Sequence, residues 1–164
     1  DFMMDQWRNL KGEGEYKGPN MVFVIGGYDE NKPYGSRYEF QIPNKPKPIP
    51  LDTRIDDFGI NWGGQMEYVE RVLQGYDNKV FGIIKDALGA SNDQLADLKN
   101  RFSSLGMQVP LQAMALQDCV NLALFYIRTT ISAQNLSIGI RGCGGHIDVA
   151  IITRREGLKY IQRK

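Results

Sequence analysis

A glycine-rich turn near the carboxyl end constrains the fold of this 164-residue chain more than any other feature. The turn, Gly142–Gly145, follows a long stretch with helical apolar spacing and precedes Ile147–Ile152, which has apolar residues on both faces. A phosphate-binding glycine loop runs the other way, because it leads from a strand to a helix amino terminus, where free N–H groups hold the anion. The turn therefore argues against a nucleotide site and predicts a strand that enters a core. We expect Gly144 and Gly145 to be required by the backbone of this turn.

The composition is that of an ordinary globular protein. Hydrophobic residues make up 42% of the chain and charged residues 24%, so a chain of this length can bury a core without disulfides or metal. A net charge of +1 and the lack of an apolar span of roughly 20 residues argue against nucleic-acid and membrane partners. Cys119 and Cys143 are typical of free thiols in a reducing compartment, with one disulfide as the alternative. We expect a cytoplasmic protein.

The start of the chain resembles part of a helix. Phe2, Met3 and Trp7 fall near helical spacing. Because the first residue is Asp1 and not Met, we interpret the chain as a fragment or processed product, with a boundary left by tag cleavage as the alternative.

Apolar periodicity predicts strands on both sides of a helical block. The predicted strands are Met21–Ile25, Arg37–Ile42, Phe58–Trp62, Ile147–Ile152 and Leu158–Ile161. The predicted helices are Gln65–Gly75, Val80–Leu88, one opened by a capping box at Ser91–Gln94, and the longest at Leu111–Gln134. Strands grouped on either side of helices predict an α+β fold instead of alternating βαβ units.

Two segments carry further structural expectations. The stretch Cys119–Ile127 is apolar on nearly every side of its helix, which predicts a position between two layers. The stretch Pro43–Pro50 holds four of the seven prolines and predicts a stiff extended connector that stays out of a sheet interior. We interpret this stretch as a surface connector in preference to a partner-binding proline motif.

Three motifs resemble the proteasome β-subunit branch of the amino-terminal-nucleophile hydrolases. Val24–Glu30 is similar to a strand end of that family, Gly63–Gln65 to its glycine turn before a helix, and Cys143–Gly145 to its serine-glycine-glycine turn. The resemblance implies the second half of a four-layer αββα sandwich, so residues 1–164 are expected to be a single domain or the carboxyl-terminal part of one. Residues 78–108 exceed the family's usual link between two helices and are expected to be a helical insertion.

The function implied by the resemblance is that of a peptidase or amidase subunit of the threonine-peptidase type. Such subunits act on peptides and assemble into rings through their helical layer, so a homo-oligomer or ring assembly is expected, without cofactor or metal. The family's nucleophile is the first residue of the mature chain, whose own α-amino group accepts the proton. Asp1 has no hydroxyl or thiol, so we expect this chain to lack the nucleophile segment and to be inactive alone. The alternative is a non-catalytic structural or interaction subunit of the same architecture.

The supporting groups that the resemblance implies for this half are incomplete. Cys143 stands where the family has a serine, while Gly144 and Gly64 offer backbone N–H groups that can stabilise an oxyanion. A small hydroxyl of the family corresponds to Gly63 and an aspartate to Ile140, neither of which can take part in proton transfer. The candidate site residues are therefore Cys143, Gly144 and Gly64, in supporting roles.

A free-standing cysteine enzyme is a third function class. His146 lies three residues after Cys143, and Asp148 is near enough in sequence to orient the imidazole. A thiol nucleophile and its base must meet within hydrogen-bond reach, and the plainer interpretation is a small turn residue beside a strand-edge side chain. The same pair is only half of a zinc site, because Cys119 lies in a helix with no second ligand beside it.

Two other features have plain structural interpretations. Asp56 and Asp57 are adjacent on an extended chain and point apart, so we expect solvated carboxylates and not a dyad that shares a proton. Trp62 lies beside two glycines, and we expect it in a core or interface, with a pocket wall as the alternative.

Overall fold

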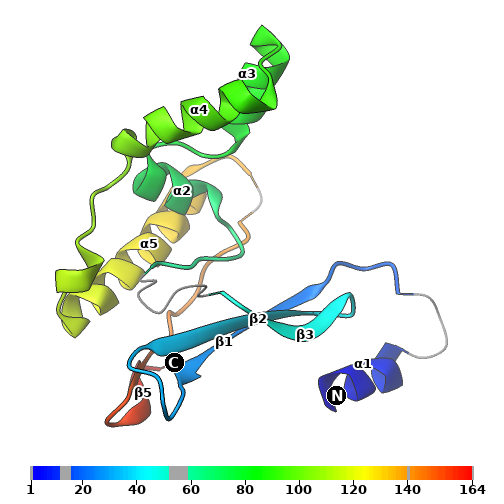
Figure 1. The fold of residues 1–164 in the computed structure, drawn as a ribbon, viewed down its shortest axis with the longest axis vertical. Helices are drawn as coiled ribbons and strands as arrows, with labels where there is room; N and C mark the ends of the chain where they lie inside the picture. Colours follow the sequence, from blue (N-terminus) through cyan, green and yellow to red (C-terminus); the bar gives the residue numbers. More distant parts are fainter. Residues whose placement is uncertain (1, 12–15, 52–58, 140, 164) are drawn as a thin grey trace. The chain divides into compact units, whose positions relative to one another are not determined.

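A three-stranded sheet, a two-stranded sheet and a group of helices make up the computed structural model, which describes residues 2–11, 16–51, 59–139 and 141–163 (Figure 1). The predicted α+β class is confirmed. The chain divides into two compact units, Asp1–Asp57 with Ile151–Lys159 and Phe58–Ala150 with Tyr160–Lys164. Within the described ranges, no helix is long and apolar enough to cross a membrane.

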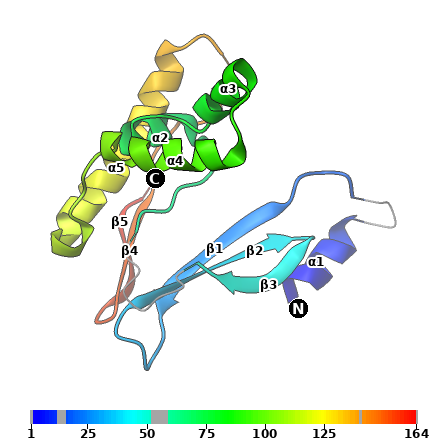
Figure 2. The same ribbon diagram turned by 45° about the horizontal axis from the view of Figure 1, so that its top comes forward.

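An antiparallel meander forms the larger sheet. Its strands β1 (Met21–Tyr28), β2 (Gly35–Ile42) and β3 (Lys45–Pro50) lie in the order β1-β2-β3 (Figure 2). Phe23 of β1 pairs with Phe40 of β2, and their rings stack with centroids 4.9 Å apart. Cross-strand aromatic pairs of this kind stabilise one register, because a slip of one residue would send the rings to opposite faces.

The proline-rich segment, predicted as a stiff extended connector kept out of a sheet interior, forms the edge strand β3. It is extended, as predicted, and it lies at the edge of the sheet, where proline is tolerated. Leu51 N–H, next along the chain, donates to the Arg37 carbonyl at 2.8 Å. Because strand residues alternate in direction, Pro46, Pro48 and Pro50 occupy positions whose amides would face away from β2. The prolines therefore remove no hydrogen bond from the ladder.

The first helix, α1 (Phe2–Lys11), confirms the helical spacing read from the start of the chain. Phe2 and Met3 line a hollow with Phe40 and Ile42 of the meander. Ile42 is 1% exposed and is the most deeply buried side chain of the described residues. The core of this unit is therefore small and centred on the end of β2.

Three helices follow in the second unit, close to their predicted positions. They are α2 (Glu67–Gln74), α3 (Lys79–Leu88) and α4 (Asn92–Phe102). Gly75 and Gly89 end α2 and α3 with φ angles of 82° and 62°, a left-handed conformation that favours glycine. The local chemistry of helix ends was thus enough to place these boundaries.

The predicted capping box at the start of α4 is confirmed. Gln94 N–H donates to Ser91 Oγ at 3.3 Å, and Ser91 N–H donates to Gln94 Oε1 at 2.8 Å. Tyr76, Phe81 and Phe102 form an aromatic cluster that holds α3 and α4 beside the end of α2. The segment 78–108 is therefore helical, and its status as an insertion stays a prediction.

The longest helix, α5 (Leu116–Leu136), begins later than predicted. A single 3-10 turn at Leu111–Ala113 precedes it. Met114 and Ala115 are extended, with ψ angles of 136° and 153°, and they separate the two helical segments. The apolar spacing could not predict this break, because the spacing continues across the two extended residues.

Only one side of α5 is buried, so the prediction of a helix enclosed by two layers was wrong for the described residues. Cys119 is exposed, and Phe125 and Ile127 are 46% and 39% exposed. The helix α2 packs against α5. The buried stripe of α5 is partly polar: Val120, Tyr126, Thr130 and Gln134.

The smaller sheet is a hairpin of β4 (Val149–Thr153) and β5 (Gly157–Gln162). The hairpin is confirmed, but β4 starts two residues after Ile147 and is half-buried with alternating exposure, and β5 is exposed along its length. The predicted strand at Phe58–Trp62 was wrong where it can be compared, because residues 59–62 are not in a strand and Phe58 lies outside the described residues.

Candidate functional site

The loop before α2, the buried stripe of α5 and the glycine turn after it surround one cavity of about 270 Å³. We call it the Cys143 cavity. None of the described side chains on its walls carries a formal charge, and most of the wall is apolar. The lining residues are Ile60, Asn61, Trp62, Gly63, Gln65, Val69, Ala123, Tyr126, Ile127, Thr130 and Cys143.

Gln134 joins the two glycine turns beside this cavity. Its Oε1 accepts hydrogen bonds from the N–H groups of Gly142 and Cys143 at 3.0 and 2.9 Å. Its Nε2 donates to Oε1 of Gln65 at 3.3 Å. Because Gln134 is only 7% exposed, water competes little for these bonds. One amide on α5 therefore holds the turn at Cys143 to the turn at Gln65.

The glycines of the turn differ in what they require. A Cβ on Gly142 would lie 2.6 Å from Nε2 of Gln65, so the end of that side chain would have to shift to admit one. Gly145 has a φ of 85°, which disfavours any L side chain. Gly144 has no positive φ, and no atom of the described residues lies within 4 Å of an added Cβ. The prediction for Gly145 is supported, whereas that for Gly144 was wrong.

The structure brings part of the predicted site together. Cys143 is half-buried on the cavity wall, and Gly63 lines the same wall. Gly64 and Gly144 are chain neighbours of these residues and do not line the cavity themselves. Their role as oxyanion donors stays a prediction. Trp62, expected in a core or interface, is half-buried on the wall of the cavity.

The described residues contain no paired thiol nucleophile and base of the kind that a free-standing cysteine enzyme requires. His146 is exposed, and no hydrogen bond joins it to Cys143 within residues 141–163. The described ranges also contain no group of three or more histidine, cysteine or acidic side chains placed to hold a metal ion. Asp56, Asp57 and Ile140 lie outside the described residues.

Sequence reasoning missed the polar residues beneath the cavity. Tyr126 is 4% exposed, and its hydroxyl donates to Sδ of Met107 at 3.8 Å. Burial raises the pKa of the Tyr126 hydroxyl, so it is neutral at physiological pH. Thr130 Oγ1 donates to the Tyr126 carbonyl at 3.0 Å. Tyr126, Thr130 and Gln134 are spaced by four, and this repeat of polar groups on one helix face was the available signal.

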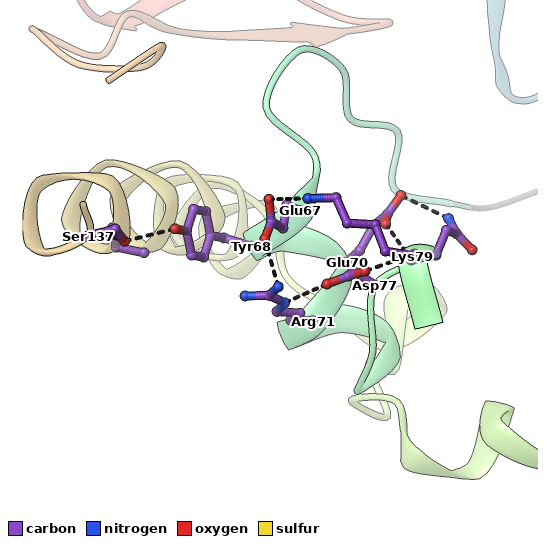
Figure 3. A network of polar contacts seen from close by, with 9 residues as sticks. Glu67, Tyr68, Glu70, Arg71, Asp77, Lys79 and Ser137 are labelled. Atoms are coloured by element: carbon purple, nitrogen blue, oxygen red, sulfur yellow. Dashed lines mark hydrogen bonds and ion pairs between the residues drawn. The ribbon is translucent and has the colours of Figure 1, made fainter. Parts of the chain in front are cut away.

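A separate polar network fixes α2 (Figure 3). Glu67 accepts hydrogen bonds from Arg71 at 2.6 Å and from Lys79 at 2.9 Å. Arg71 Nε also donates to Asp77 at 2.7 Å, and this bond holds the pKa of Asp77 below its usual value. Figure 3 shows Tyr68 pointing toward Ser137, whose Oγ lies 2.9 Å from the tyrosine hydroxyl. The network ties α2 to the start of α3 and to the end of α5.

Glu70 has a structural role in the same network. It is 8% exposed and accepts two hydrogen bonds from Asn78, one from the backbone N–H at 3.2 Å and one from Nδ2 at 3.1 Å. Asn78 is the residue that precedes α3. A carboxylate at a helix start satisfies donors that have no partner within the helix. We therefore assign Glu70 to the α2–α3 junction and not to catalysis.

Comparison with known proteins yields no relative for this chain: no protein-family model matches it, and searches of curated proteins and of solved structures give no match. The Cys143 cavity and the motifs that surround it are therefore the features of this chain that bear on its function.

Proposed function

We propose that this chain is the carboxyl-terminal half of a proteasome-like amino-terminal-nucleophile hydrolase, a cytoplasmic peptidase or amidase subunit that works in an oligomeric ring. The observation that carries the proposal is the contact between two turns far apart in sequence. Gln134 binds the Cys143 turn and the Gln65 turn at once. These are the two turns that resemble the supporting turns of that family.

The proposal includes the four-layer αββα sandwich. Packing of α2 against α5 supports one helical layer. Large apolar side chains stay uncovered on that layer and on the meander: Phe125 is 46% exposed, and Val22 and Val24 are each 57% exposed. Exposed apolar surface of this kind marks a surface that needs a partner. In the proposed fold, the other half of the domain and neighbouring subunits cover it.

In this proposal the amino-terminal half of the domain supplies the nucleophile. The residues of this chain stabilise the charge that develops during the reaction. Gln134 already takes up the N–H groups of Gly142 and Cys143. The N–H of Gly144, which follows these two in the turn, is the proposed donor to an oxyanion, together with that of Gly64. The Cys143 thiol replaces a hydroxyl as a weak donor beside the reacting group.

The test uses the longest natural protein that contains these residues, in its assembled form. We expect it to hydrolyse fluorogenic peptides and to be labelled by a peptide vinyl sulfone at an amino-terminal Thr, Ser or Cys. Gln134→Leu should lower kcat in the assembled protein, because it releases the supporting turn. Gln117→Leu is the matched control, since Gln117 is exposed on α5 and bonds only Asn121 among the described residues.

A non-catalytic structural subunit of the same architecture is the second candidate. It is favoured by Gly63, which offers no hydroxyl where the resemblance implies one. An assembled protein that neither hydrolyses peptides nor takes up the vinyl sulfone would refute the hydrolase and favour this candidate.

A further inference from the structure

We infer that the Cys143 cavity binds one neutral apolar side chain of a peptide, of the size of phenylalanine or leucine. The inference rests on the proposed function, because it names the substrate class of the same site. It uses the size of the cavity, the chemistry of its walls and the state of its polar groups.

The size of the cavity selects a single side chain. Its volume is about 270 Å³. An engineered protein cavity of roughly 150 Å³ holds one benzene molecule, and sites for drug-sized ligands span roughly 300–1,000 Å³. The Cys143 cavity therefore has room for one aromatic ring or branched aliphatic group with part of its backbone, and too little room for a larger organic ligand.

The walls of the cavity disfavour a charged guest. Trp62, Val69 and Ile127 supply apolar surface, and no lining residue within 59–139 or 141–163 has a formal charge. A charged side chain that entered would lose its hydration without gaining a counter-ion, which is costly. For a neutral apolar side chain, transfer from water into the cavity is favourable.

The polar groups beneath the cavity are already bonded within the protein. The hydroxyl of Thr130 donates to a helix carbonyl, that of Tyr126 donates to Met107, and the amide of Gln65 bonds Gln134. The two hydroxyl groups and the side-chain oxygen of Gln65 therefore require no polar partner from a guest. Because Gln134 also fixes the turn, the wall at Cys143 is formed before a guest arrives, and preorganisation lowers the cost of binding.

Cys143 provides a direct measure of occupancy. Its side chain lines the cavity, so a bound guest blocks access to the thiol. Cys119 is exposed on α5, is also a free thiol and does not line the cavity. The two cysteines of one molecule therefore serve as reporter and internal reference.

The experiment measures alkylation of each cysteine by iodoacetamide in the folded full chain, quantified by mass spectrometry. The probes are N-acetyl-phenylalaninamide, N-acetyl-leucinamide and, as the matched charged probe, N-acetyl-lysinamide. At ten times its Kd, a guest that must leave before the thiol reacts slows alkylation about tenfold by mass action. We expect this slowing at Cys143 with the two apolar probes, no slowing with the lysine probe, and an unchanged rate at Cys119.

Variants that fill the cavity test the location. Ala123→Phe places a ring inside it from the α5 wall and should abolish protection by the apolar probes. Ala96→Phe makes the same chemical change on the exposed surface of α4 and should leave protection intact. If Ala123→Phe does not fold, Ile127→Trp fills the space from a side chain that is 39% exposed.

Three results would overturn the inference: equal protection by the lysine probe, no protection by any probe, or a Cys143 thiol that does not react even without a probe. The assay requires no hydrolysis. A complete protein that cleaves peptides without apolar preference would therefore contradict this inference and leave the proposed function standing. If the apolar probes protect Cys143 selectively but the complete protein cleaves no peptide, the proposed function would be contradicted and this inference would stand.

Discussion

Gln134 shows how much of the candidate site depends on one amide. Its oxygen accepts two hydrogen bonds and its nitrogen donates a third, all from a position that is 7% exposed. The N–H groups of Gly142 and Cys143 both donate to this oxygen, so the turn takes its acceptor from α5. The residue is therefore a structural link between α5 and both turns.

We predict that Gln134→Leu lowers the free energy of unfolding by about 1–3 kcal/mol, the cost of leaving buried donors without partners. Urea denaturation monitored by circular dichroism measures it. The control, Gln117→Leu, changes an exposed residue of the same helix and should stay within about 0.5 kcal/mol of the parent. Equal midpoints for both variants would show that the turn does not need the amide.

The glycines of the turn give a second prediction at this scale. Gly145→Ala should destabilise the fold by about 1–2 kcal/mol, because its φ of 85° places a Cβ against the following carbonyl. Gly144→Ala should have little effect, because an added Cβ meets no atom within 4 Å. Thermal unfolding of the pair provides the comparison, and a larger effect at Gly144 would contradict the described backbone.

The elements of the second unit are joined by charge as well as by packing. Arg71 of α2 contacts both Glu67, one turn earlier, and Asp77, which lies in the link to α3. Exposed pairs contribute little one by one, but Asp77 is more enclosed, with its side chain 11% exposed. The junction therefore orients α3 relative to α2 through a small network.

We predict that Asp77→Asn weakens this junction and removes part of the acid sensitivity of the fold. Arg71 lowers the pKa of Asp77 in the folded state, so the carboxylate stabilises the fold above the unfolded pKa of 3.8. That contribution is lost as the pH falls through the lower folded value. Unfolding midpoints measured from pH 7 to pH 2 should decline less steeply in Asp77→Asn. Asp97→Asn, in an exposed pair within α4, should keep the parental profile.

Features with a local cause could be predicted from the sequence, and features with a distant cause could not. Gly75, Gly89 and the Ser91 capping box end or start helices through neighbours in the chain. Pairing of β3 depends on β2, and the position of Trp62 on a cavity wall depends on α5. The hydrogen bond of Gln134 could not be predicted from the sequence, because its partner Gln65 lies 69 positions away.

At the scale of the whole molecule, uncovered apolar surface stands out. In β1, Val22, Val24 and Ile25 are between 54% and 57% exposed, and in β5 Leu158 is 61% exposed. A soluble monomer seldom leaves such residues together on strands whose edges are open. This exposed apolar surface is what the proposed assembly would cover.

We predict that the chain on its own self-associates and binds a dye that recognises apolar surface. Val24→Lys should reduce both effects, because it places a charge in the middle of the exposed strand. Lys47→Arg, which keeps a charge on β3, is the control. Sedimentation velocity and dye fluorescence provide the measurements. A parent chain that sediments as a monomer and binds no dye would contradict the prediction.

The prolines of β3 make the two edges of the meander unequal as sites for a further strand. With Pro46, Pro48 and Pro50 on its outer side, β3 offers few amide donors to a further strand, whereas β1 contains no proline and has no second neighbour among the described strands. A further strand would therefore meet more amide donors along the free edge of β1 than along that of β3. We therefore expect a larger sheet that contains this meander to extend from β1 and to keep β3 at its edge.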